Sequence, residues 1–334
     1  FAGEQEIKTG SDRDIRKEYK VFKDHHLKDI HSFKLFKYKR EDKTVYVSLP
    51  LPIIIYCEGE LDVFMSSKFY NKKNKRVEYK VDDRIYKIDD HEHIKAKNSL
   101  GEPLSVLDLS ITKNVAFIIL AFLLMVVVFG KMAKSYKHNS IPSGFGRFLE
   151  PIVLYIRDDI ARPNIGEKHY KRYMSFLLTV FFFIWFVNLF GLTPLGSNVT
   201  NSIAVTASLA VLTYVITTFT ANKNYWGHIF WMPGVPTPMK IILAPIELLG
   251  TIIKPFSLMI RLYANMTAGH VVLMSILGLI FIFQNWLGGT LSFGLAFALA
   301  LLELLVCALQ AYIFTMLSAL YFGAAVEEHH HDEH

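Results

Sequence analysis

The residues of this 334-residue chain whose types can do chemistry in an apolar setting form a set of seven in its C-terminal half. They are Glu247, Lys254, Arg261, Asn265, His270, Glu303 and Gln310. An ionisable side chain in lipid costs at least about 2.5–3.5 kcal/mol, so such residues mark ion paths or proton relays by default. Carboxylates, an imidazole and cations in one apolar stretch therefore predict the handling of protons or other ions across a membrane.

The surroundings of this set are almost free of charge. From Met174 to Val326 the sequence has six charged residues, whereas a soluble domain carries about 25%. Lys223 and Lys240 stand at the ends of apolar runs, where their ammonium groups can reach the membrane surface, and they need no special role. The C-terminal half is therefore a membrane protein, and a wholly soluble globular protein is excluded.

The spacing of the charged residues places them on defined faces of a helix. Glu247, Lys254 and Arg261 are seven residues apart, and seven steps of about 100° return to within about 20° of the start. Asn265 stays near that face. His270, nine residues beyond Arg261, points about 180° away. The helix therefore presents a cationic polar stripe to one side and an imidazole to the other.

Two internal pairs can satisfy some of these charges: Glu247 with Lys254, and His270 with Glu303, which shares a helix face with Gln310. For Glu247 and Lys254 a purely structural pair is an equal alternative to a functional role. Arg261 differs, because a guanidinium cannot discharge in a protein. No carboxylate stands at its helical neighbours, so its counter-charge comes from Glu303 or from another polypeptide. Since Glu303 is better placed for His270, we expect a partner's carboxylate.

Five apolar runs are candidates for membrane spans, each of which needs about 20 residues. They are Asn114–Met132, Tyr173–Leu195, Ser202–Thr220, Ile241–Phe283 and Leu291–Phe322. As a helix, the 43 residues of Ile241–Phe283 reach about 65 Å, twice the hydrocarbon thickness. Two ordinary spans would put Lys254 and Arg261 at an otherwise apolar turn. We therefore predict a long, strongly tilted hairpin of the last two helices, closed by the turn Asn285–Gly289.

The basic residues orient these spans, because lysine and arginine in short loops mark the cytoplasmic side. Loop 131–172 carries nine of them, and the turns 196–201 and 284–290 carry none. The N-terminal region is then outside, and the C-terminal tail (327–334) is flexible and cytoplasmic. Within the basic loop, apolar residues at helical spacing over about 145–160 predict an amphipathic surface helix. Topology also explains the formal net charge of +6, so we expect a lipid bilayer and no nucleic acid as partner.

Residues 1–110 form a separate polar region. Alternation at Thr44–Ser48, an apolar run at Ile53–Tyr56 and an extended stretch at Lys80–Lys87 predict a small β-rich external, periplasmic domain. The basic stretch Lys72–Arg76 is expected to be a solvated turn. No metal site and no disulfide framework are expected, since Cys57 and Cys307 fall one in each half and the histidines lack a framework of further ligands. Those histidines are His25, His26, His31, His91 and His93.

Four motifs resemble subunit a of F-type ATP synthases, of the bacterial type with an N-terminal extension. The first is the stretch Lys254–Met266 (KPFSLMIRLYANM), followed by Ala268-Gly269. The others are Asn188–Pro194 (NLFGLTP), Pro245–Glu247 (PIE) and Leu309–Phe314 (LQAYIF), in the right order along the chain. The resemblance covers about residues 110–325. The first 110 residues lie outside the common family pattern and resemble a lineage-specific extension.

The resemblance implies an all-α membrane domain (111–326) that serves as a stator channel in the bacterial inner membrane. The family's essential arginine falls on Arg261, with polar neighbours at Asn265 and Gln310, and its proton-path groups fall on Glu247, His270 and Glu303, with Lys254 beside them. The implied partners are the c-subunit ring, the peripheral-stalk subunit b and the remaining subunits. Two aqueous half-channels would load and unload ring carboxylates, with Arg261 between them.

The sequence departs from the common bacterial pattern at one pair. That pattern has a carboxylate where His270 stands and an imidazole where Glu303 stands, and here the two are exchanged. An exchange across a contacting pair keeps one acid and one imidazole in place, so we interpret it as preserving a proton relay and favouring H⁺ over Na⁺. The order in which the two groups take the proton stays open.

Other protein classes are compatible with an intramembrane Arg/Glu/His site. A secondary active transporter is the main alternative, but it would show internal repeats, and the 245–270 pattern has no second copy. A self-contained channel would need a filter-like segment, and a purely structural subunit leaves Arg261 unexplained. Without a GxxxxGK[ST] phosphate loop, the chain is expected to be non-catalytic, with no cofactor and with nucleotide chemistry in other subunits.

Overall fold

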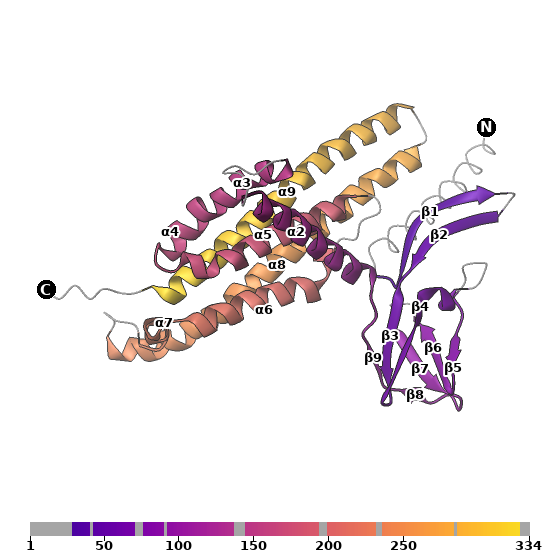
Figure 1. Cartoon of the computed structure of the whole chain (residues 1–334), viewed down its shortest axis with the longest axis horizontal. Helices are drawn as coiled ribbons and strands as arrows, with labels where there is room; N and C mark the ends of the chain where they lie inside the picture. The colour runs from indigo at the N-terminus through magenta and orange to yellow at the C-terminus, as the bar shows by residue number, and fades with distance from the viewer. Residues whose placement is uncertain are drawn as a thin grey trace, which may run out of the picture. The chain divides into compact units, whose positions relative to one another are not determined.

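The computed structural model describes residues 29–40, 43–70, 76–89, 92–136, 144–193, 199–231, 236–283 and 286–327. Contacts within the chain divide it into two compact units, residues 1–120 with 193–197 and residues 121–192 with 198–334 (Figure 1). Several predicted features lie outside the described residues: most of the turn at Lys72–Arg76, three histidines (His25, His26 and His91), and the tail beyond Glu327.

The first unit is rich in antiparallel β-structure, as the sequence predicts. Its described strands form a two-stranded sheet β1-β2, a three-stranded sheet β4-β3-β9 and a four-stranded sheet β5-β6-β7-β8. The strands are β1 (Ser32–Arg40), β2 (Lys43–Pro50), β3 (Pro52–Cys57), β4 (Glu60–Met65), β5 (Tyr79–Val81), β6 (Arg84–Ile88), β7 (Ile94–Asn98), β8 (Pro103–Leu104) and β9 (Val106–Asp108), with a 3₁₀ turn η1 (Ser66–Phe69) after β4.

The three-stranded and four-stranded sheets pack against each other through one apolar core. In β3 the period of two turns Ile53, Ile55 and Cys57 inward, where they meet Tyr86 of β6 and other buried side chains. The stretch Lys80–Lys87, expected to be one extended segment, is instead the hairpin of β5 and β6. Asp82 makes the turn with a φ of 48°, a left-handed conformation that aspartate tolerates because its side chain can bond locally.

The second unit is helical. Its elements are α2 (Lys113–Tyr136), which begins in the first unit, α3 (Phe145–Tyr155), the π-helical turn η2 (Ile156–Ala161), α4 (Arg162–Ile165), α5 (Tyr170–Leu192), the 3₁₀ turn η3 (Val199–Asn201), α6 (Ile203–Thr220), α7 (Lys223–Phe230), α8 (Thr237–Phe283) and α9 (Trp286–Val326). Among the described residues, five helices are long and apolar enough to cross a membrane: α2, α5, α6, α8 and α9. They match the five predicted spans, whereas α7 was not predicted.

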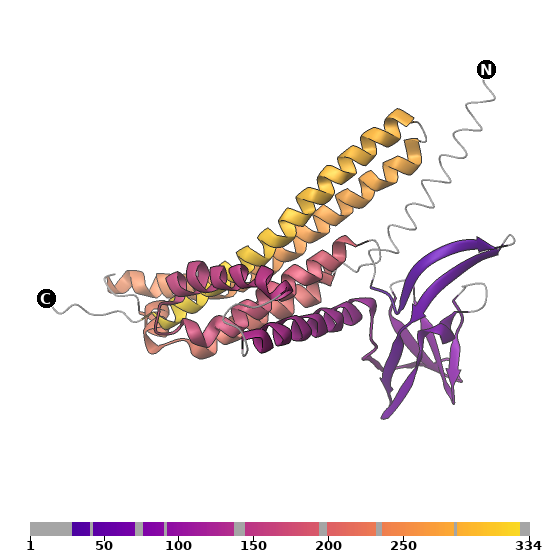
Figure 2. The same ribbon diagram turned by 45° about the horizontal axis from the view of Figure 1, so that its top comes forward.

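Helices α8 and α9 lie side by side as a long pair (Figures 1 and 2). α8 has 47 residues and stays helical through Pro245 and Pro255, and α9 has 41 residues. At 1.5 Å per residue α8 is about 70 Å long, against about 30 Å of hydrocarbon, so it fits a bilayer only at a steep inclination. The predicted closing turn is shorter than expected, because Trp286 to Gly289 already belong to α9.

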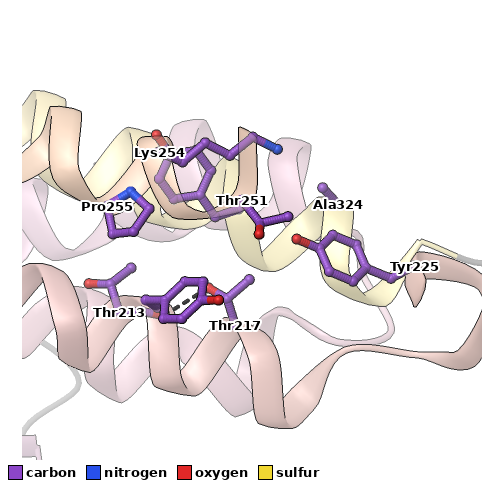
Figure 3. A pocket seen from close by; sticks show the side chains of 9 residues that line it. Thr213, Thr217, Tyr225, Thr251, Lys254, Pro255 and Ala324 are labelled. Carbon is purple, nitrogen blue, oxygen red and sulfur yellow. Dashed lines mark hydrogen bonds between the residues drawn. The ribbon is translucent and has the colours of Figure 1, made fainter. Parts of the chain in front are cut away.

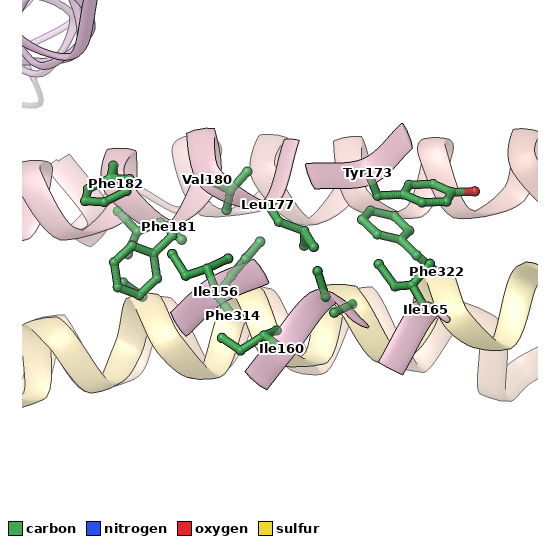
Figure 4. Close-up of a cluster of buried hydrophobic side chains, with 14 of the residues drawn as sticks. Ile156, Ile160, Ile165, Tyr173, Leu177, Val180, Phe181, Phe182, Phe314 and Phe322 are labelled. Atoms are coloured by element: carbon green, nitrogen blue, oxygen red, sulfur yellow. The ribbon is translucent and has the colours of Figure 1, made fainter. Parts of the chain in front are cut away.

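The core of the helical unit lies between α5, α9 and the segment from α3 to α4 (Figure 4). The rings of Tyr173 and Phe322 stack with centroids 4.6 Å apart. At Gly323 the backbones of α9 and α4 approach so closely that a Cβ atom would lie 1.8 Å from the carbonyl oxygen of Asn164. Glycine is therefore required at this crossing, since a larger residue would force the two helices apart.

The helix predicted over about 145–160 forms, but it is interrupted by the π-helical turn η2. Leu149 and Ile156 are completely buried in the protein core, whereas Phe148 is exposed. The apolar spacing thus serves packing within the chain as well as an outer surface. That the segment lies along the membrane surface stays a prediction.

Candidate functional site

His270 of α8 and Glu303 of α9 lie together in the interior. The Nδ1 atom of His270 is 3.7 Å from the Oε1 atom of Glu303, and both side chains are about 5% exposed or less. Gly269 lies against the same carboxylate, since a Cβ atom there would be 3.6 Å from Oε1. Neither carboxylate oxygen has a hydrogen-bond partner among the described residues. A buried acid in this state is costly when charged unless a proton or a cation reaches it.

Polar contacts join the α5–α6 connection to the turn of α8 that precedes His270. The Thr267 hydroxyl, one turn before His270, contacts Asn201 Oδ1 of η3 and bonds the carbonyl of Tyr263 at 2.7 Å. Next to it, Thr200 donates to Asn188 Oδ1 at 2.9 Å, and both side chains are fully buried. Sequence reasoning did not assign these residues to the site. The only available signal was the helical offset of three between Thr267 and His270.

Asn265 and Gln310 join α8 to α9 directly. Asn265 Nδ2 donates to Gln310 Oε1 at 2.9 Å, and Gln310 is buried. The spacing argument set His270 on the side of the helix opposite the polar stripe, yet both Asn265 and His270 reach residues of α9. The two helices run alongside each other over many turns, so one neighbour receives side chains from both flanks of α8.

Arg261 is half-buried on α8, one turn before Asn265. Its neighbours Leu258 and Leu262 are buried, so α8 packs into the core on a side that lies about 60–100° around the helix from Arg261. Across the described part of the chain, no carboxylate oxygen lies within 4.0 Å of the guanidinium and no hydrogen bond to it is formed. Its electrostatic neighbour is the Tyr321 hydroxyl of α9. The predicted lack of an internal counter-charge therefore holds for the described residues.

Glu247 and Lys254 do not form the direct ion pair that the sequence allowed, since no contact under 4.0 Å joins them within the described ranges. Lys254 Nζ instead lies 6.0 Å from the centre of the Tyr321 ring, an arrangement that a cation and an aromatic face favour. The ammonium and the carboxylate both line one cavity without direct contact between them.

Two adjoining cavities open between α6, α7, α8 and α9. The larger, of about 210 Å³, contains Glu247, Lys254, His228 and Glu327 in its wall. The smaller, of about 20 Å³, is lined by threonines, tyrosines and Lys254 (Figure 3). Lys254, Tyr225 and Ala324 belong to both walls. Burial, and then the neighbouring Tyr214 and Glu247, raise the pKa of Tyr225 above its ordinary value, so its hydroxyl keeps its proton at the cavity wall.

Comparison with known proteins matches residues 115–323 to the family model of the ATP synthase A chain. Residues 22–114 match a model described as a domain of unknown function, DUF8433. A relative named ATP synthase subunit a from Chloroherpeton thalassium is 44% identical over 68% of this chain and 70% of its own length. The chain is also similar to ATP synthase subunit a from Anaeromyxobacter sp. strain Fw109-5, which is 40% identical over 75% of this chain and 64% of its own length. ATP synthase subunit a 2 from Chlorobaculum tepidum is 44% identical over 68% of this chain and 66% of its own length. The chain therefore belongs to the ATP synthase subunit a family.

Proposed function

We propose that this chain is the proton-translocating stator subunit of a rotary ATP synthase. In this role it forms two aqueous half-channels that load and unload protons on carboxylates of the c-subunit ring. The observation that carries the proposal is the position of Arg261: a half-buried permanent cation without an internal counter-charge in the described chain, set between two polar regions of α8. Such a cation requires an anion from outside the chain.

The first half-channel runs through the polar contacts that end at His270 and Glu303. Asn188, Thr200, Asn201 and Thr267 supply hydroxyl and amide groups along it. Histidine ordinarily titrates near pH 6.5, so an imidazole can pass protons in either direction without a large energetic penalty. The proton then neutralises a rotor carboxylate, which can face lipid only when uncharged.

The second half-channel is the pair of cavities between α6, α7, α8 and α9. Glu247 and His228 offer titratable groups in the wider part, and Lys254 stands where the two cavities adjoin. A proton released by the rotor would leave through this water-filled space. The cavities and the His270–Glu303 pair lie on either side of Arg261 along α8, which is the order that two separate half-channels require.

Arg261 acts electrostatically between the two paths. A positive charge within about 4–6 Å lowers the pKa of a carboxylate by roughly 1–3 units, so a rotor carboxylate opposite Arg261 releases its proton. The same fixed charge repels a proton that would pass directly between the half-channels. Because 100 mV supplies about 2.3 kcal/mol for each elementary charge, several protons are needed for each ATP.

The exchange of acid and imidazole between positions 270 and 303 fits this mechanism. The two side chains are in contact range, so the relay keeps one of each in the same space. Asn265 and Gln310 act as positioning residues, because their hydrogen bond holds α9 against α8 one turn beyond Arg261.

The assembly and topology follow from the same proposal. The chain contacts the c-subunit ring and the peripheral-stalk subunit b of the complex, and the nucleotide chemistry belongs to other subunits. It is a multi-pass protein of the bacterial inner membrane, with residues 1–110 on the periplasmic side and the C-terminal tail in the cytoplasm. The basic loop 131–172 supports that orientation.

The test is replacement of Arg261 in the assembled ATP synthase. We expect Arg261→Ala to abolish proton-driven ATP synthesis in inverted membrane vesicles, and Arg261→Lys to restore little of it, since a lysine can discharge when buried. Lys240→Ala is the matched control, because Lys240 stands near the start of the same helix over the ring of Trp231 and should leave synthesis intact. Undiminished coupled synthesis in Arg261→Ala would remove this residue from the mechanism.

A further inference from the structure

The outer face of the β4-β3-β9 sheet carries apolar side chains that form a grid of three rows across the strands. The register pairs Tyr56 of β3 with Leu61 of β4 and Leu107 of β9. Two further rows follow at intervals of two residues, since Val63 faces Ile54, and the Leu109 N–H donates to the Ile54 carbonyl at 2.9 Å. The third row consists of Met65, Pro52 and Ile111, with the Ile111 N–H bonded to the Pro52 carbonyl at 3.1 Å.

This grid is not part of the core of the first unit. The core takes the alternate residues of β3, Ile53 and Ile55, which are completely buried. On the outer face Val63 is 61% exposed and Leu109 is 55% exposed, and the other outer residues of β4 are similar. Contiguous exposed apolar surface of this kind marks an interaction site.

The grid continues along the backbone into the first membrane helix. The backbone runs from β9 through Ile111 into α2, and the Lys113 N–H bonds the Ile30 carbonyl at 3.0 Å. Lys113 and Asn114 at the junction are buried, and the Asn114 N–H bonds Oδ1 of the exposed Asp29 at 3.0 Å. The next outward residue is Val115 of α2, a helix apolar enough to span the membrane.

We propose that this face rests on the lipid surface of the membrane, with the row of Ile111 deepest. Val115 follows Ile111 by four positions, and four residues reach at most about 14 Å even when fully extended. The layer of lipid headgroups outside the hydrocarbon is about 5–8 Å deep on each side. The third row is therefore held at the edge of this layer by the chain itself.

The charged residues around this face indicate which of its ends lies nearer to the membrane. Glu58 and Glu60 stand exposed at the β3–β4 turn, beyond the row of Tyr56, and carboxylates avoid anionic headgroups. The exposed lysines of the other sheet, among them Lys87 and Lys97, leave from the opposite side of the packed sheets. Successive rows are about 7 Å apart along the strands. Along β4 the depth in the lipid should thus decrease from Met65 through Val63 to Leu61.

Spin labels on β4 of the full-length chain test this order. Met65→Cys, Val63→Cys and Leu61→Cys each carry one label, and Lys97→Cys is the water-facing control. The wild-type chain is the labelling blank, because its two cysteines are buried. The chain is reconstituted into phosphatidylethanolamine–phosphatidylglycerol vesicles, and collision rates with oxygen and with a water-soluble nickel chelate are measured. Reaction of Cys57 with a maleimide reports any variant that fails to fold.

We expect nickel collisions at Met65 to be several-fold below those at Lys97 and to rise through Val63 to Leu61. Equal collision rates at all four positions overturn the proposal. Labels that are water-exposed in vesicles but protected in the assembled ATP synthase overturn it too, and assign the face to a protein partner instead. None of these outcomes depends on Arg261, so this proposal and the stator mechanism fail separately.

Discussion

At the scale of single residues, the contact between His270 and Glu303 has the clearest chemical consequence. Glu303 is buried without a hydrogen bond from the described residues, and the imidazole lies at 3.7 Å. In the proposed relay this space needs one acid and one imidazole side by side. The two side chains should therefore be interchangeable as a unit.

The exchange of the pair tests this coupling. His270→Glu and Glu303→His each leave two like groups in one buried space, so each alone should severely reduce proton-driven ATP synthesis. The double variant His270→Glu/Glu303→His restores one acid and one imidazole and should recover a substantial part of the rate. Synthesis rates of the four proteins form a double-mutant cycle. If the two losses simply add in the double variant, the residues do not act as a pair.

Asp108 in the first unit gives a prediction for pH dependence. Burial alone would raise the pKa of Asp108, but His31 and Ser110 outweigh it and the pKa is lowered. A lowered carboxyl pKa contributes stability at neutral pH that disappears as the pH falls through the lowered value. Asp108→Asn should therefore lose up to about 1 kcal/mol at pH 7, limited by partial exposure, and nothing in strong acid.

Hydrogen–deuterium exchange of peptides from β3 and β9, wild type against variant at each pH, measures this difference. Glu58→Gln, which changes an exposed carboxylate in the same unit, is the control and should match wild type throughout. If the difference in exchange between Asp108→Asn and wild type stays the same in acid, its cause is the altered side-chain shape and not the lost carboxylate charge.

The sequence predicted some of the contacts between functional side chains and not others. It singled out Arg261 and the His270–Glu303 contact because charges in an apolar stretch are rare and few partners exist for them. It could not predict the contact of Lys254 with Tyr321 or that of Thr267 with Asn201. Each joins segments far apart in the chain through at least one neutral partner, Tyr321 or Asn201, which hydropathy and charge do not distinguish from ordinary polar or aromatic residues.

At the scale of elements, the long helices were predictable and their interruptions were not. Hydropathy located all five spanning helices to within a few residues at most ends. The continuity of α8 through Pro245 and Pro255 follows a general rule, since neighbouring helices and local adjustment compensate prolines in membrane helices. The π-helical turn η2 had no signal, because its sequence is compatible with an ordinary α-helix.

The crossing of α9 with α4 yields an element-scale prediction. In Gly323→Ala the new methyl group would overlap the Asn164 backbone, so we expect a loss of about 1–3 kcal/mol in stability, typical of overpacking. Thermal unfolding of the detergent-solubilised chain measures it. Gly294→Ala is the control on the same helix, because it faces open space and should be neutral or stabilising by about 0.5–1 kcal/mol. Equal melting temperatures for both variants would contradict this close approach.

At the scale of the whole molecule, much of the apolar surface has no partner within the chain. Only 11% of the spanning window of α8 and 22% of that of α9 is buried. Lipid covers part of this surface, but the half-buried Arg261 lies on it too, and a cation is not stable against lipid alone. The site is therefore incomplete in the isolated chain, because its described residues do not supply an anion to Arg261.

This incompleteness separates a stator from a secondary active transporter. Proteoliposomes that contain the isolated chain should show no proton flux above empty vesicles under an imposed potential, because in the proposed mechanism both half-channels would end at mid-membrane without the rotor. The measurement is the quenching of a pH-sensitive dye. Vesicles with the complete membrane sector are the positive control. Saturable flux through the isolated chain would instead identify a carrier that works alone.

The length of α8 has one more consequence. From Glu247 to His270 the helix axis advances about 35 Å, more than the hydrocarbon is thick. An inclination that fits the whole of α8 into about 30 Å of hydrocarbon turns that advance into about 15 Å of depth. Glu247 and His270 would then differ in depth by about half of the hydrocarbon, so they would experience different fractions of the transmembrane voltage. Part of the electrical work on a proton would therefore be done between the two ends of this stretch of α8.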